Sequence, residues 1–138
     1  MADRVLNILL VEDDEVDVMN VRRAFERNNV SNPLYVAGNG LEALEMLRDG
    51  TVPTERRLIL LDLNMPKMNG IEFLQALRAD PDLSSTPVVV LTTSNDDQDK
   101  IDAYNFNVAG YLLKPVTFSS FCERMATLDK YWALVEMP

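Results

Sequence analysis

Residues 58–70 read LILLDLNMPKMNG, and this stretch decides the fold. Its four leading apolar residues form a run too short for a buried helix and typical of a buried strand. Asp62 stands near the end of that strand and is followed by a loop that contains Pro66 and Gly70. A buried or half-buried carboxylate is costly unless it is paired, hydrogen-bonded or bound to a metal. The rest of the chain must therefore supply a partner for Asp62.

Similar apolar runs recur along the chain and alternate with segments of helical periodicity. We predict strands at residues 8–11, 34–37, 58–61, 88–91 and 111–113. The intervening segments carry apolar residues at helical spacing, as in Ile101, Tyr104 and Val108 before the last strand. Strict alternation predicts parallel βαβ units with right-handed crossovers, and nearly all-apolar strands are typical of a sheet covered on both faces. The sequence predicts an α/β fold: a doubly wound three-layer α/β/α sandwich of five strands and five helices.

Cap signals mark the starts of three predicted helices. Asn39 and Asn69 are each followed three residues later by a glutamate, Glu42 and Glu72, which is the spacing of a capping box. Thr117 opens the last helix. These residues predict where the helices begin.

Chain length and composition limit the possible functions. The 138 residues suit one domain, which we expect at residues 5–130, with a tail at 131–138 and no room for an effector domain. The net charge of −9 disfavours contact with nucleic acid or anionic lipid. No apolar stretch approaches the roughly 20 residues that a membrane span needs. The single cysteine, Cys122, and the absence of a signal-like start favour the cytoplasm.

The chain contains no histidine, which removes the usual general base and the usual zinc ligand. Carboxylates, hydroxyls and lysine remain, and they follow four predicted strands: Glu12-Asp13, Asp62, Thr92 and Lys114. The carboxyl ends of parallel strands share one edge of a sheet, where ligands bind. Acids that meet there need a cation, and oxygen-only ligation suits Mg²⁺. With a lysine and a hydroxyl beside it, such a site is equipped to form an aspartyl phosphate on Asp62.

Each of these residues taken alone has a simpler explanation. Glu12, Asp13 and Asp14 could be acids at a helix N-terminus, stabilised by the helix dipole. Lys114-Pro115 could simply end a strand, and Thr92 could be an ordinary strand former. Their shared position at one edge favours the functional interpretation.

The combined pattern resembles the receiver domain of two-component response regulators over nearly the whole chain. The matching residues are Glu12-Asp13, Asp62, Asn64-Met65-Pro66, Gly70, Thr92, Tyr111 and Lys114-Pro115. The resemblance implies a flavodoxin-like sheet with strand order 2-1-3-4-5. It also implies that Asp62 accepts the phosphoryl group and that Mg²⁺ is bound by the side chains of Asp13 and Asp62, by the backbone carbonyl of Asn64, and by Glu12 through water.

The same resemblance implies a switch. Lys114 would pair with a phosphoryl oxygen, Thr92 would move toward it, and Tyr111 would turn inward. The output face would comprise the fourth helix, the fifth strand and the fifth helix, and the peptide bond before Pro115 would be cis. We expect a phosphoacceptor that catalyses its own phosphorylation and slow dephosphorylation, rather than a metabolic enzyme.

A narrower resemblance lies in Leu91-Thr92-Thr93-Ser94 and in the tail at 131–138, both similar to stand-alone regulators of phytochrome histidine kinases. It implies a histidine kinase partner of phytochrome type. Tyr131, Trp132 and Val135 near the chain end could cover a second copy of the chain, and we expect a homodimer through the output face.

Two other functions remain open from the sequence. The first is a Mg²⁺-dependent phosphohydrolase that uses Asp62 as a transient nucleophile and needs a second acid, for which Asp14 is the nearest spare candidate. The second is a non-catalytic docking module with a degenerate site.

Overall fold

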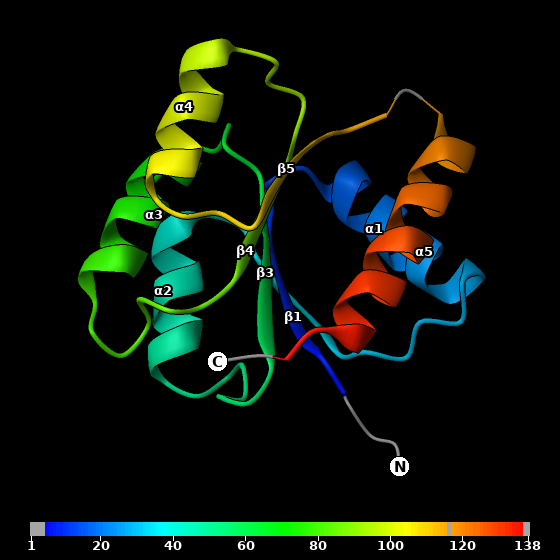
Figure 1. The fold of residues 1–138 in the computed structure, drawn as a ribbon, viewed down its shortest axis with the longest axis horizontal. Coiled ribbons are helices and arrows are strands. Elements are labelled where there is room, and N and C mark those ends of the chain that lie inside the picture. Colours follow the sequence, from blue (N-terminus) through cyan, green and yellow to red (C-terminus); the bar gives the residue numbers. More distant parts are fainter. Residues whose placement is uncertain (1–4, 116, 137–138) are drawn as a thin grey trace.

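The computed structural model describes residues 5–115 and 117–136, in which five parallel strands form one sheet in the order β2-β1-β3-β4-β5 (Figure 1). The strands are β1 (Asn7–Val11), β2 (Leu34–Ala37), β3 (Arg57–Leu61), β4 (Val88–Thr92) and β5 (Gly110–Leu113). The helices are α1 (Glu15–Arg27), α2 (Gly40–Arg48), α3 (Gly70–Ala79), α4 (Asp97–Asn105) and α5 (Phe118–Leu134). The predicted fold class and strand order are confirmed.

The sheet is covered on both faces, with α1 and α5 on one side and α2, α3 and α4 on the other (Figure 1). Because successive strand residues point to opposite faces, each strand contributes to two cores. Leu9 and Ile59 pack in the core under α2 and α3, where Phe73 is fully buried. Ile8 and Leu58 pack in the core under α1 and α5.

The predicted caps form, with one difference. Asn69 and Glu72 make a reciprocal capping box at the start of α3. Asn39 accepts the backbone N–H of Glu42, but the Glu42 carboxylate accepts from the N–H of Gly38 at 2.6 Å and not from that of Asn39. Thr117 accepts from Ser120 at the start of α5.

The predicted apolar stripe of the fourth helix is wrong. Ile101 and Tyr104 are 54% and 52% exposed, and Val108, although buried, lies beyond the end of α4. The small side chain of Ala103 is the buried residue of this helix. Most of the remaining residues of α4 are polar, and only two of the three residues of the predicted stripe lie in the helix, so the apolar spacing was too weak to fix its inward face.

The last helix runs to Leu134, so the first four residues of the expected tail at 131–138 are helical. Residues 137–138 of that tail lie outside the described residues.

Strand register brings the ends of four strands together. Val11 pairs with Leu61, Leu61 with Val90, and Thr92 with Leu113. The residues that follow these pairs therefore leave the sheet at one common edge.

Candidate functional site

Three acids meet at the carboxyl edge of the sheet. Oxygens of Glu12, Asp13 and Asp62 all lie within 4.8 Å of one another. Glu12 and Asp62 are 3% and 6% exposed, while Asp13 is open to solvent. Glu12 and Asp13 follow β1, and Asp62 follows β3, so the neighbouring strands of the sheet hold the group together. An all-oxygen donor set with one solvent-facing acid fits a hard divalent cation such as Mg²⁺, which keeps several of its waters.

Lys114 places an ammonium among these acids. Its Nζ lies 2.6 Å from Oε1 of Glu12, 2.7 Å from Oδ2 of Asp17 and 3.5 Å from Oδ2 of Asp62. Burial opposes the charge on Lys114, but the hydrogen bonds to Asp17 and Glu12 and the charge of Asp62 outweigh it, so the pKa of the ammonium is raised. Lys114 is therefore a cation at neutral pH.

Several opposing effects act on the pKa of the Glu12 carboxyl group. Burial raises the pKa of Glu12 to about 7, aided by the charge of Asp62 and partly offset by Lys114. The negative charges of Glu12 and Asp62 thus repel each other, and a bound divalent cation would relieve this repulsion.

Asp62 is held by its neighbours as well as by its strand. Its Oδ1 accepts a hydrogen bond of 2.8 Å from the Thr92 hydroxyl and one of 3.3 Å from the backbone N–H of Asn64. Thr92 is fully buried at the end of β4. Oδ2, the oxygen nearer to Lys114, lies on the other side of the carboxyl group.

The loop after Asp62 is packed tightly against the start of α3. A Cβ placed on Gly70 would lie 2.6 Å from Cα of Leu63 and 2.8 Å from the carbonyl oxygen of Asp62. The N–H of Gly70 donates to the Leu63 carbonyl at 3.0 Å. Only a glycine permits this approach, which gives a packing reason for a glycine at position 70. Pro66 lies exposed in the same loop.

Tyr111 lies on β5 and is half-buried. Its hydroxyl donates a hydrogen bond of 2.9 Å to the carbonyl oxygen of Ser94, in the loop between β4 and α4. The side chain therefore ties the loop after Thr92 to the last strand.

One expectation about Pro115 is not met. No cis peptide bond occurs within residues 5–115 and 117–136, so the bond before Pro115 is trans. The trans form is the intrinsically preferred isomer of an X-Pro bond.

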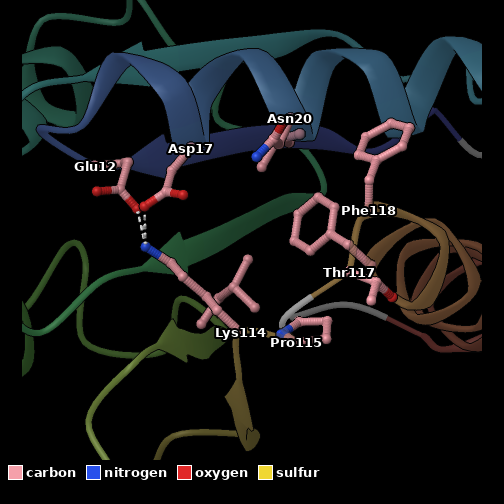
Figure 2. Close-up of a pocket in the computed structure, with 10 residues that line it drawn as sticks. Glu12, Asp17, Asn20, Lys114, Pro115, Thr117 and Phe118 are labelled. Carbon is pink, nitrogen blue, oxygen red and sulfur yellow. Dashed lines mark hydrogen bonds and ion pairs between the residues drawn. The ribbon is translucent and has the colours of Figure 1, made fainter.

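A pocket of about 220 Å³ opens beside Lys114, between α1 and the start of α5. Figure 2 shows Glu12, Asp17 and Lys114 at one end of it and Phe118 at the other. Asp17 was missed from the sequence. A signal was present, because Asp17 lies four residues after Asp13 and three after Asp14, and such spacing at a helix start points an acid back over the preceding turn.

Sequence comparison agrees with this geometry. The family model of the response regulator receiver domain matches residues 8–126. The chain belongs to this family. A receiver domain is the phosphoacceptor module of two-component signalling.

Relatives of this receiver come from different systems. "Probable methanogenesis regulatory protein FilR2" of Methanothrix harundinacea is 39% identical over 127 residues, which cover 91% of this chain and 82% of the relative. "Response regulator Rcp1" of Synechocystis is 36% identical over 128 residues, which cover 91% of this chain and 87% of the relative.

Solved structures give the same result. The phosphorylated cyanobacterial phytochrome response regulator RcpA aligns with a TM-score of 0.86 at 33% identity, over 97% of this chain and 99% of RcpA. The Mn²⁺-bound form of Rcp1 aligns with a TM-score of 0.81 at 36% identity, over 95% and 97% of the two chains. This receiver is thus homologous to RcpA, a phytochrome response regulator, and to Rcp1, which has been solved with bound Mn²⁺.

Within residues 5–115 and 117–136, no helix has the length and apolar character needed to cross a membrane.

Proposed function

We propose that residues 5–130 act as a single-domain response regulator, which takes a phosphoryl group from a phosphohistidine of a partner kinase onto Asp62. One observation carries this assignment. Asp62 belongs at once to the three-acid cluster and to the contacts of Thr92 and Lys114, at 2.8 Å and 3.5 Å.

The donor set fits Mg²⁺, which would supply charge neutralisation between the acids and the incoming phosphoryl group. Asp13, Asp62 and the Asn64 carbonyl would hold it directly, and Glu12 through water.

The remaining chemistry belongs to the side chains of this chain. Thr92 and the Asn64 N–H hold Oδ1 of Asp62, which leaves Oδ2 as the attacking oxygen. A bond forms between Oδ2 and phosphorus as the phosphorus–nitrogen bond to the donor imidazole breaks, and the imidazole leaves with the electron pair of that bond. Lys114, already 3.5 Å from Oδ2, contacts the charged oxygens of the phosphoryl group.

The test is labelling with acetyl phosphate and Mg²⁺. We expect one phosphoryl group per chain, released by hydroxylamine as an acyl phosphate. Asp62→Asn should abolish labelling, whereas Asp14→Asn should retain it, because asparagine also caps helices. Labelling that survives Asp62→Asn would contradict the assignment.

The phosphohydrolase alternative is less well supported. It needs a second acid over the site, and the Asp14 carboxylate instead accepts the backbone N–H groups of Val16 and Asp17 at the start of α1. The docking-module alternative is disfavoured by the convergence of Glu12, Asp13 and Asp62.

We propose that this protein acts in the cytoplasm and that its partner is a phytochrome-type histidine kinase. The similarity to RcpA and Rcp1 supports this partner, while the similarity to FilR2 means that other kinases belong in the test. Phosphotransfer profiling should find the fastest transfer from a phytochrome-type kinase. A preference for a kinase of another type would remove the phytochrome assignment and leave the phosphoacceptor assignment intact.

We also propose a homodimer through the α4-β5-α5 face, and no binding of nucleic acid or membrane. Tyr131 and Leu134 on α5 are 59% and 81% exposed. Leu112 of β5 and Leu128 of α5 line a shallow depression of about 470 Å³ beside Tyr131. An apolar face of this kind supports association between copies.

A further inference from the structure

Among the residues that the structure describes, Asp17 is the one acid in contact with Lys114 that lies outside the three-acid cluster. It comes from the first turn of α1, whereas Glu12 and Asp62 come from strand ends. Its Oδ2 accepts from Nζ of Lys114 at 2.7 Å, close to the 2.6 Å of the contact to Glu12 (Figure 2). The Asp17 side chain is 32% exposed and that of Lys114 11%. The ammonium is thus held from two sides.

Glu12 and Asp17, the two acids that hold the Lys114 ammonium, differ in what else they can bind. Glu12 is one of the acids whose oxygens converge in the cluster, so a divalent cation there competes with Lys114 for Glu12. The same cation repels the ammonium. Asp17 is not a member of the cluster, so its carboxylate stays available to Lys114 when a cation binds.

The position of Nζ also suits a phosphoryl group on Asp62. Nζ lies 3.5 Å from Oδ2, which is longer than a short charged hydrogen bond. A phosphoryl group bonded to Oδ2 brings further oxygens within reach of an ammonium at this distance. An ammonium has three donors, so Lys114 can bind Asp17 and a phosphoryl oxygen at the same time.

We propose that Asp17 is a positioning residue for Lys114, which keeps the ammonium beside Oδ2 of Asp62 when the cluster holds a cation, ready to bind a phosphoryl oxygen. This inference rests on the proposed phosphoacceptor function. Asp17 does not touch the reacting atoms and acts through Lys114. It makes the phosphoryl site more complementary to its ligand by pre-ordering a flexible side chain.

The experiment measures binding of beryllofluoride, a phosphoryl mimic, at saturating Mg²⁺. Asp17→Ala should weaken beryllofluoride binding by about fivefold or more, the loss expected for a partly exposed charged hydrogen bond. Asp17→Glu, which keeps the charge, should restore most of the affinity. The matched control is Glu15→Ala, which removes an exposed acid from the same helical turn and should change affinity by less than about twofold.

A double-mutant cycle tests whether Asp17 acts through Lys114. In a Lys114→Ala background, Asp17→Ala should have no further effect on beryllofluoride affinity. A second readout needs no phosphoryl mimic: at saturating Mg²⁺, the NMR signals of the Lys114 side chain should sharpen and move toward those of a free lysine in Asp17→Ala and stay in place in Glu15→Ala.

The outcomes separate this inference from the function on which it rests. If the wild-type protein fails to bind beryllofluoride, the phosphoacceptor function itself is wrong. If the wild type binds and Asp17→Ala binds equally well, or if the loss persists without Lys114, only the role of Asp17 is wrong. Tighter binding by Asp17→Ala would show that Asp17 competes with the phosphoryl group, and would overturn the inference.

Discussion

The hydroxyl of Thr92 donates a 2.8 Å hydrogen bond directly to Oδ1 of Asp62, and both residues are buried. The family resemblance implies that Thr92 moves toward a phosphoryl group. The structure places it at the carboxyl group itself, so the Thr92 hydroxyl also orients the carboxylate of Asp62.

Replacing Thr92 by valine keeps the shape and removes the hydroxyl. We expect a free energy of unfolding lower by about 1–2 kcal/mol, because a buried carboxylate loses a hydrogen bond, and slower labelling by acetyl phosphate. Denaturant unfolding and labelling rates measure the two effects. The control is Thr93→Val, at the exposed neighbouring position, which should leave both unchanged.

Lys114→Ala leaves Glu12 and Asp62 without their cation. We expect the metal-free protein to lose about 2 kcal/mol or more of stability, since unpaired buried charges are costly. Mg²⁺ should bind more tightly to the variant than to the wild type, because no ammonium competes for the acids. Thermal unfolding with and without Mg²⁺ checks this, and equal stabilisation of both proteins by Mg²⁺ would count against it.

The Lys114→Ala variant should still accept phosphate but fail to change the output face.

Gly70→Ala forces a Cβ against the backbone of Leu63 and Asp62. We expect a loss of about 1–3 kcal/mol in the free energy of unfolding, the usual range for overpacking. Labelling should slow as well, because the loop after Asp62 must shift. Gly38→Ala is the control, since its Cβ would meet nothing closer than 3.9 Å.

Tyr111 gives a pH dependence. Burial, with the charges of Asp99, Asp96 and Asp62, raises the pKa of Tyr111 above its ordinary value of 10.0. The folded state therefore favours the protonated phenol. Its contribution to stability is fully present below the unfolded-state pKa and is lost as pH rises through the folded-state pKa. Above pH 10.0, wild-type stability should fall more steeply than that of Tyr111→Phe, as measured by denaturant unfolding at each pH. Tyr104→Phe, at an exposed position, should behave like the wild type.

The proposed dimer can be tested by the molecular mass of the protein in solution. Light scattering should show a dimer, and Tyr131→Asp should favour the monomer by placing a charge on an exposed apolar face. Val16→Asp, on an exposed part of α1, is the control. If the wild-type protein is a monomer both with and without beryllofluoride, the dimer proposal is wrong.

Most of the architecture could be predicted because two strong signals coincide. Buried strands such as β3 are short and apolar, and their alternation with helices fixes a parallel sheet. Once the sheet is parallel, the strand-end residues Glu12, Asp62, Thr92 and Lys114 must share one edge. The convergence of the acids could therefore be predicted from the order of the strands along the chain, before any interatomic distance was known.

The remainder depended on contacts that the sequence does not encode locally. The sequence is equally compatible with a Lys114 ammonium that contacts Asp62 and no acid of α1. The contact with Asp17 depends on where α1 packs in the tertiary structure. For α4, the inward face could not be predicted because its one buried residue, Ala103, is too small to stand out in an apolar pattern.

That weak anchorage of α4 has a consequence for dynamics. A helix held by one small buried side chain gains little from apolar burial, so its detachment costs less than that of α3, which buries Phe73, Leu74 and Leu77. Amide protons of α4 should exchange with solvent ahead of those of α3. A change at Asp62 that reached α4 would then need to supply only a small amount of free energy to re-seat this segment.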